Sequence, residues 1–423
     1  MSDNPSDQQD AKLTSSMPPT VWKPEFPDGG SRAWSVAAGA AGLMFCAFGY
    51  VNSFGVYQEY YLLNQLSTRP PDDISWIGSL QVFFLFSGTL IGGPLFDRYG
   101  SVVLWPSALL FVFSVMMTSL CKEYYQFLLA QGILEGITSG MIMAPGLAAV
   151  SHYFFHNRGA ALGLAVGGSS LGGVIFPIAL TKMLNQPSLG FGWSVRICAF
   201  LMLGILLPSC VAVRPRLPPR KKAIVLWSAF RSPLFLSTVL SNFFLVMGLF
   251  IPMFYLPTYA KHAHGMPQQL SLYLVAMLNG GSFFGRIILG MAADRVLGRL
   301  NVLGISSLAT GIMCFCWPRA QSVGAIIVFS TIYGFTSGAV VSMLSACFAQ
   351  IPKDPGDIGT YIGMGMFCVA FGALIGTPIS GVLVSRSGGF ETASIFSGVM
   401  TTVGSFMVLF VKVLSGKGMW SKY

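Results

Sequence analysis

The chain has 423 residues, of which 53% are hydrophobic and only 9% are charged, and its formal net charge is +10. Soluble domains carry roughly 25% charged residues, so this composition excludes an ordinary soluble protein and predicts a membrane protein. All eight cysteines except Cys121 lie within apolar runs, which argues against a disulfide framework or a metal site. We therefore expect no metal and no cofactor.

The first 34 residues precede the apolar part of the chain. Residues 1–26 are polar, rich in Ser, Asp, Gln and Pro, and lack the apolar core of a signal peptide. This composition is typical of a disordered segment. We predict a disordered cytoplasmic tail over residues 1–34, with delivery to the membrane relying on the first transmembrane helix.

Long apolar stretches follow. A helix that crosses the hydrocarbon core needs about 20 largely apolar residues, and twelve such stretches predict an all-α membrane protein with twelve transmembrane helices. Residues 214–231 hold six basic residues, three prolines and no acidic residue, which predicts a cytoplasmic linker against anionic lipid head groups. The linker separates two six-helix halves, 35–213 and 232–413, and 414–423 is a cytoplasmic tail. The predicted spans are 35–57, 76–96, 102–120, 125–150, 159–181, 193–213, 232–257, 268–292, 300–317, 322–346, 358–383 and 392–413.

The basic residues predict the orientation. With both termini in the cytoplasm, seven Lys and Arg fall on the outer side and Arg286 falls inside a span, which leaves 17 of the 25 on the inner side. This bias follows the positive-inside rule. Topology therefore accounts for the net charge, and we expect no nucleic-acid partner. The outer residues are Arg69, Lys122, Lys182, Arg196, Lys261, Arg319 and Arg386.

Three short stretches recur at a nearly constant distance. GGPLFDRYG after the second span returns as GMAADRVLG after the eighth, which places Asp97 and Asp294 197 residues apart. GITSG at 136–140 returns as GFTSG at 334–338, and Pro177 has a counterpart in Pro378. Matches in the same order indicate an internal duplication. Because each half has an even number of spans, the copies share one orientation, a parallel repeat typical of secondary transporters with the solute site between the halves.

The stretch at 93–100 resembles the motif between the second and third helices of the major facilitator superfamily, and the stretch at 290–298 is similar with one extra residue. In both, an aspartate near a helix end can pair with the following arginine or face a helix N-terminus, and the glycines let two helices approach closely. We predict a conformational switch formed by Gly93, Asp97, Arg98, Gly100, Gly290, Asp294 and Arg295.

Two further stretches resemble the monocarboxylate-transporter-like family within this superfamily, and specifically its fungal branch. They are PDGGSRAW at 27–34 and YFFHNRGAALGLAVGGSSLGG at 153–173. Animal members usually carry two adjacent basic residues where this chain has Asn157 and Arg158. The resemblance covers the chain from residue 27 and leaves the solute open.

Arg286 stands inside the predicted eighth span, where an arginine costs about 2.5–3.5 kcal/mol on insertion scales. Asn279, Ser282 and Arg286 recur at helical spacing and form one polar stripe. The stripe favours a guanidinium that faces a central cavity; the alternative is a structural ion pair.

The family resemblance adds a role for this arginine. In relatives with monocarboxylate substrates an arginine at this position holds the carboxylate, and a planar guanidinium can bind both carboxylate oxygens. Those relatives carry an aspartate where Ser282 stands and a lysine where Asn52 stands. We therefore predict anion recognition with a wider tolerance for larger, less polar acids. The predicted solute-binding residues are Arg286, Asn279, Ser282, Tyr50 and Asn52.

Glu135, in the fourth span, is the other deeply placed ionisable residue. A buried carboxyl group can carry a proton near neutral pH, so one hypothesis is that Glu135 replaces the missing aspartate in proton coupling and pairs with Arg286 across an empty cavity. The alternative is a bond within its own half. Tyr50 shares a face of the first span with Ser53 and Tyr57, where it can stack on an aromatic solute or pack against neighbouring helices.

These features predict a monomeric secondary transporter in the plasma membrane. Its partners are a small organic, acidic solute, the lipid bilayer and, in a coupled cycle, protons. Export of a secondary metabolite is the favoured direction, and proton-coupled uptake of a monocarboxylate or vitamin is the alternative. A non-transporting nutrient receptor is a second alternative, but it would be expected to carry a long cytoplasmic tail. No pattern of nucleophile and base predicts an enzyme.

Overall fold

Regular structure is helical throughout the part of the chain that the structure describes. The computed structural model describes residues 26–218, 225–263, 265–387, 389–415 and 418. Residues 1–25 of the predicted N-terminal tail, 219–224 of the predicted linker and most of the predicted C-terminal tail lie outside these ranges. The helices are α2 (Gly30–Val51), α3 (Phe54–Leu63), α4 (Pro71–Tyr99), α5 (Leu104–Thr118), α6 (Tyr124–Phe127), α7 (Gly136–Tyr153), α8 (Arg158–Leu184), α9 (Gly190–Ala212), α10 (Pro233–Thr258), α11 (Gln268–Ala292), α12 (Arg299–Cys316), α13 (Val323–Phe348), α14 (Ile358–Ser387) and α15 (Glu391–Leu414).

Short segments of different pitch join several of these helices. Three are π-helical: η2 (Leu128–Glu135), η4 (Tyr259–Ala263) and η5 (Ala293–Leu297). Four are 3₁₀-helical: η1 (Gly100–Val103), η3 (Trp227–Arg231), η6 (Trp317–Arg319) and η7 (Pro355–Asp357).

Every predicted span overlaps a helix, but the described residues form eleven helical segments that are long and apolar enough to cross a membrane. The difference from twelve arises where α4, η1 and α5 follow one another without a loop, so that Asp73–Thr118 is one run of 46 residues. Gly100 turns the chain there with a φ of 67°, a conformation that favours glycine because it lacks a Cβ.

The N-terminal boundary and the first span also differ from the prediction. The first span is two helices, α2 and α3, separated by a turn at Asn52 and Ser53. Because α2 begins at Gly30, the chain is already helical before residue 34, the predicted end of the disordered tail.

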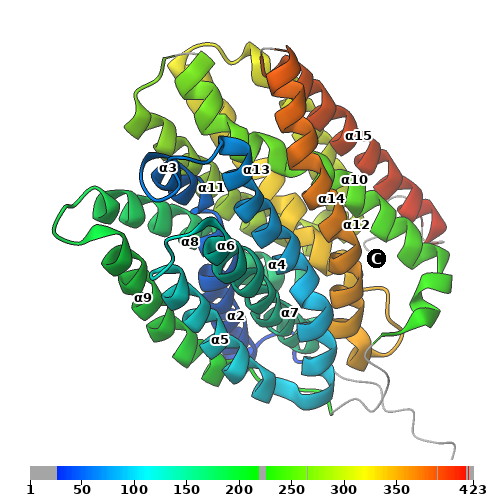
Figure 1. Cartoon of the computed structure of the whole chain (residues 1–423). Helices are drawn as coiled ribbons and strands as arrows, with labels where there is room; N and C mark the ends of the chain where they lie inside the picture. Colours follow the sequence, from blue (N-terminus) through cyan, green and yellow to red (C-terminus); the bar gives the residue numbers. More distant parts are fainter. Residues whose placement is uncertain (1–25, 219–224, 264, 388, 416–417, 419–423) are drawn as a thin grey trace, which may run out of the picture.

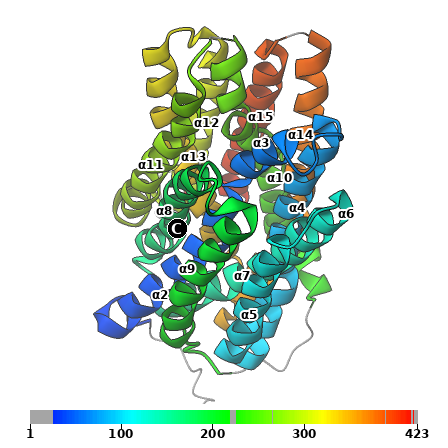
Figure 2. The ribbon, with the colours of Figure 1, turned by 60° about the vertical axis from the view of Figure 1, so that its left-hand side comes forward.

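The helices form two groups that follow each other in the sequence. The N-terminal group, α2 to α9, occupies the lower left and the centre of Figure 1, and the C-terminal group, α10 to α15, occupies the top and the right. The groups meet along two pairs of helices, α4 with α14 and α8 with α11 (Figure 2). Large apolar side chains such as Phe113, Phe200 and Phe410 remain exposed, as expected of a bundle whose solvent is lipid.

Candidate functional site

Both copies of the glycine–aspartate motif contact the start of a helix in the other group. Asp97, in α4, accepts hydrogen bonds from the backbone amides of Gly359 (3.2 Å) and Thr360 (2.7 Å) at the start of α14. Asp294, after α11, accepts from the amides of Gly159 (2.9 Å) and Ala160 (2.8 Å) at the start of α8. A carboxylate is stabilised at a helix N-terminus by the free amides and the helix dipole.

The motif glycines make these contacts possible. A Cβ on Gly93 would collide with the carbonyl oxygen of Gly359, and one on Gly290 would lie 2.6 Å from that of Gly159. Gly298, the counterpart of Gly100, also has a positive φ, 82°. Of the two alternatives for Asp97, pairing with Arg98 or facing a helix N-terminus, this conformation has the second.

The two motif arginines point elsewhere. Arg98 and Arg295 are exposed, and the guanidinium of Arg98 lies 5.4 Å from the ring centre of Tyr99. We call the end of the bundle that carries Asp97 and Asp294 the motif end.

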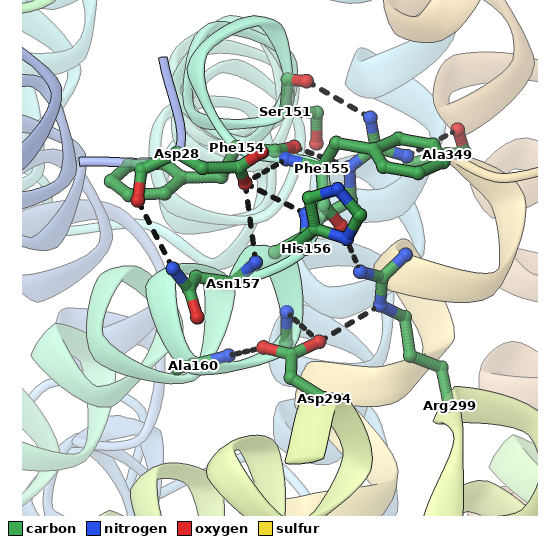
Figure 3. Close-up of polar contacts among 12 residues, drawn as sticks. Asp28, Ser151, Phe154, Phe155, His156, Asn157, Ala160, Asp294, Arg299 and Ala349 are labelled. Atoms are coloured by element: carbon green, nitrogen blue, oxygen red, sulfur yellow. Dashed lines mark hydrogen bonds and ion pairs between the residues drawn. The ribbon is translucent and has the colours of Figure 1, made fainter. Parts of the chain in front are cut away.

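The two stretches that carry the family resemblance meet at the motif end. One carboxylate oxygen of Asp28, just before α2, accepts from the amides of Phe155 (2.6 Å), His156 (2.7 Å) and Asn157 (3.3 Å) in the turn between α7 and α8. Asn157 in turn donates to the carbonyl oxygen of Asp28 at 3.0 Å (Figure 3). Asp28 has a φ of 50°, which is uncommon for a residue other than glycine, so this contact holds a strained backbone.

Two buried arginines extend this network across the groups. Arg158 donates to the carbonyl oxygens of Phe154 and Ser151 in its own group and to that of Ala349, which follows α13, at 3.0 Å. Arg299 pairs with Asp294 at 3.2 Å and donates to the carbonyl oxygen of Phe155 (Figure 3). The motif end is therefore closed by bonds between the groups, beside a cavity of about 280 Å³.

The opposite end of the bundle is hollowed between the groups, and we call it the cavity end. A cavity of about 390 Å³ lies there, and one of about 120 Å³ shares Gly55, Gln58, Phe254 and Thr258 with it. Glu59 and Lys261, one from each group, form an ion pair at 3.6 Å beside the larger cavity. The larger cavity is also lined by Asn52, Val56, Leu62, Pro177, Pro257, Ser271 and Val275.

In the predicted polar stripe of α11, Arg286 and Asn279 lie against α8, whereas Ser282 lies against Gly338 of α13. Arg286 is 1% exposed, and its Nη1 donates to the carbonyl oxygen of Val166 (2.6 Å) and to the hydroxyl of Ser169 (2.5 Å). Arg286 Nε, Asn279 Oδ1 and Ser282 Oγ are buried without a hydrogen-bond partner. Of the predicted solute-binding residues, Asn52 lines the larger cavity. Ser271 and Val275 of α11 also line this cavity, and the polar stripe lies further along α11 toward the motif end.

Glu135 and Tyr50 are buried within the N-terminal group. Glu135 accepts a hydrogen bond from Gln81 at 2.5 Å, and none of the ion pairs among the described residues joins it to Arg286. The alternative prediction, a bond within its own half, fits this conformation. The hydroxyl of Tyr50 is hydrogen-bonded to that of Tyr57, and its ring packs edge-on against Phe176.

This arrangement, apolar helices in two groups that are hydrogen-bonded to each other at the motif end and enclose the larger cavity at the opposite end, is that of a membrane carrier. The family model of the Major Facilitator Superfamily matches residues 39–349 and 274–421. The chain belongs to this superfamily, a family of transporters and not of enzymes.

Curated relatives cover nearly the whole chain. The aspyridones efflux protein of Emericella nidulans is 50% identical over 93% of this chain and 81% of its own length. The agnestins efflux protein of Paecilomyces divaricatus is 39% identical over 95% and 92%, and the fujikurins efflux protein of Gibberella fujikuroi is 39% identical over 92% and 84%.

Solved structures share the fold. The human organic anion transporter MFSD10 has a TM-score of 0.71 at 15% identity, over 90% of this chain and 100% of its own. The transporter FucP in its outward conformation has a TM-score of 0.65 at 16% identity, over 87% and 97%.

Sequence reasoning missed four residues that the structure connects: Asp28, Arg158, Arg299 and Gln81. Asp28 and Arg158 stand inside the two stretches that carry the family resemblance. The resemblance indicated that these stretches matter, but it did not indicate what either side chain contacts. Arg299 directly follows Gly298 of the motif. Gln81 carried no signal, since a single amide in an apolar span has no pattern.

Proposed function

We propose that this chain exports a small, weakly acidic secondary metabolite across the plasma membrane by alternating access. The observation that carries the proposal is its 50% identity, over 93% of its length, to a protein named for aspyridones efflux. Two further relatives are also named as efflux proteins, of agnestins and of fujikurins. The named solutes differ, which supports a common direction of transport and leaves the solute itself to experiment.

The proposal includes twelve membrane crossings in two six-helix halves related by a parallel repeat. A run of 46 residues is about 69 Å long at 1.5 Å per residue, more than twice the roughly 30 Å of the hydrocarbon core. We therefore assign two crossings to Asp73–Thr118, with the turn at Gly100. The equivalent contacts of Asp97 with α14 and of Asp294 with α8 support the repeat.

The motif end faces the cytoplasm in this proposal. Arg98, Arg158, Arg295 and Arg299 lie at this end, and the excess of basic residues on its side follows the positive-inside rule. The cavity end then faces outward, and both termini are cytoplasmic. The described conformation is outward-facing, the one from which an exporter releases its solute.

Rocking of the two groups would open the motif end and close the cavity end. The bonds of Asp97 and Asp294 to opposite helix starts must break in this step, and the contact of Arg286 with α8 must loosen. Arg286 would then offer its guanidinium to the solute's acidic group, as the likeness to the monocarboxylate-transporter-like family implies. Asn279 and Ser282, whose polar atoms lack partners here, would share in binding.

Flux measurements in proteoliposomes test the proposal. Wild-type protein and an Arg286→Gln variant would be compared under an imposed pH gradient with a panel of small and aromatic acids. Arg32→Gln, the same substitution at an exposed arginine, is the matched control. We expect the wild type and the control to move an acid and Arg286→Gln to lose at least about tenfold of the flux, because a hydrogen-bonded charge is lost.

Two results would contradict the proposal in different ways. Equal transport by Arg286→Gln and wild type would assign Arg286 to the packing of α11 on α8. A wild-type protein that moved neutral solutes but no acid would exclude the acidic solute class.

A further inference from the structure

Glu135 lies where the fourth predicted span changes its helical pitch. It is the last residue of the π-helical segment η2 and is fully buried. The adjoining helix α4 presents Gln81, which is 1% exposed. π-helical turns within α-helices are frequent at functional sites. The contacts of the motif end and of Arg286 do not involve this pair.

Glu135 and Gln81 form one hydrogen bond, and each side chain has one oxygen without a partner. Gln81 Nε2 donates to Glu135 Oε1 at 2.5 Å. The second oxygen of the carboxyl group, Glu135 Oε2, and the amide oxygen, Gln81 Oε1, are both buried without a partner. Both are acceptors when the carboxyl group is ionised. One proton on Glu135 turns its second oxygen into a donor, which is the kind of partner that the amide oxygen lacks.

In the part of the chain that the structure describes, no positively charged group pairs with Glu135. Glu135 is absent from the ion pairs of the described residues, and Arg286 donates to α8 instead. An ionised carboxylate buried without a positive partner is strongly disfavoured. The titratable groups that face it are three tyrosines, which bond to one another or to Gln131: Tyr50, Tyr57 and Tyr61.

We propose that Glu135 and Gln81 together form the proton-binding site of the carrier, and that this site holds a proton while the motif end is closed. Gln81 serves both forms of the acid. Its amide oxygen accepts a hydrogen bond from the protonated carboxyl group, and its amide nitrogen donates to the carboxylate after the proton has left. The site thus stays hydrogen-bonded through the whole cycle.

This assignment, which rests on the proposed function, sets the direction of coupling. With the cavity end open, the proton enters from the outer side as the acidic solute leaves. After the groups rock, the proton leaves through the open motif end into the cytoplasm. Export is then an exchange of solute for proton, and an acidic outer medium drives it.

The test separates proton coupling from solute movement. Wild type, Glu135→Gln and Gln81→Leu would be compared in proteoliposomes by solute exchange at equal pH and by export into an acidic medium. Tyr61→Phe, which removes a buried hydroxyl bonded to Gln131, is the matched control. We expect Glu135→Gln to keep exchange and lose the acceleration by the pH gradient, while the control keeps both.

Gln81→Leu tests the amide. The carboxylate loses its donor and the acid loses its acceptor, and the bond to the charged form is the stronger one. We expect the midpoint of the pH dependence to move upward by about one unit. An unchanged midpoint would show that Gln81 has no part in proton binding.

Infrared spectroscopy of the purified protein supplies a readout that does not depend on transport. The carbonyl stretch of a protonated carboxyl group should be present in the wild type at neutral pH and absent in Glu135→Gln. Absence of this band from the wild type, or a full response of Glu135→Gln to the pH gradient, would overturn the proposal. If the wild type moved no acid, the proposed function would fail while the band still decided proton binding.

Discussion

Asp97 and Asp294 occupy equivalent places in the two copies of the glycine–aspartate motif, yet their surroundings differ. Each accepts hydrogen bonds from the first amides of a helix in the other group. Buried arginines stand on both sides of the Asp294 contact, since Arg158 precedes Gly159 and Arg299 follows Gly298. The matching positions of the first copy are Ile358 and Ser101. The contact of Asp294 with α8 therefore lies beside two buried arginines, Arg158 and Arg299, that have no counterpart in the first copy of the motif.

The helix starts that receive these aspartates are also held differently. The turn before α8 is bonded by Asp28, which is more than 120 residues away in the sequence. The turn before α14 is bonded locally, because Asp354 accepts from the amide of Gly356 at 2.9 Å. Closure at α8 therefore depends on three segments: the stretch before α2, the turn before α8 and the chain around Asp294. Closure at α14 depends mostly on two, the chain around Asp97 and the turn before α14. We call the contacts that close the motif end the gate. The difference predicts that substitutions on the α8 side open the gate more than substitutions on the α14 side.

Cys347 offers a native reporter of this gate. It is 3% exposed and lines the cavity at the motif end. In a protein that retains only this cysteine, its rate of reaction with a thiol reagent measures how often the motif end opens.

The largest effect is expected from Asp294→Asn. The substitution leaves the buried Arg299 without a carboxylate and weakens the cap of α8, at a cost of about 3 kcal/mol to the closed motif end. Labelling of Cys347 should become about a hundredfold faster. Asp97→Asn is the matched substitution, and because Ser101 stands in the place of Arg299, its effect should be smaller. Equal acceleration by the two variants would show that the contacts of Asp97 and Asp294 hold the motif end closed to the same extent.

A smaller effect is expected from Asp28→Ala. Three backbone amides lose their acceptor, and loss of such a cap costs about 1–2 kcal/mol. Labelling of Cys347 should become roughly tenfold faster, and the thermal stability of the N-terminal group should fall with it. Asp354→Ala removes the local acceptor before α14 and should change labelling less. A stronger effect of Asp354→Ala would assign the sensitive side of the gate to α14.

The smallest effect is expected from Thr360→Ala. It removes the hydroxyl that donates to Asp97 at 2.9 Å and leaves the amide bonds, as at Ala160 in the other copy. Loss of one such bond costs about 1 kcal/mol, so labelling should become about fivefold faster. Thr331→Ala, whose hydroxyl bonds within its own helix, should leave the rate unchanged.

The sequence located most helices because the signal is local. A stretch of about 20 apolar residues needs a helix wherever it meets lipid, since only a helix satisfies its backbone within the segment. The same reasoning could not find the turn at Asn52 and Ser53, where hydropathy does not change. Nor could it find that α4, η1 and α5 follow one another without a loop, because the chain turns at the single residue Gly100.

In the candidate site, the residues of the motif could be predicted from the sequence, whereas their contact partners could not. The motif glycines and aspartates could be identified because they recur, and their closeness to helix ends follows from their place in the sequence. The partners could not be identified. Arg286 was expected to face a cavity, and in this conformation its guanidinium bonds to α8; the proposed role in anion binding stays a prediction.

By itself, the sequence determined that this chain is a helical membrane protein with a repeated glycine–aspartate motif and one arginine deep in an apolar helix. Only the tertiary structure decided that Asp97 meets α14, that Asp294 meets α8, and that Gln81 meets Glu135. The physical reason is the range of each interaction. Hydropathy and backbone conformation act over a few residues, whereas a hydrogen bond between helices depends on how two apolar surfaces pack and so on the whole bundle.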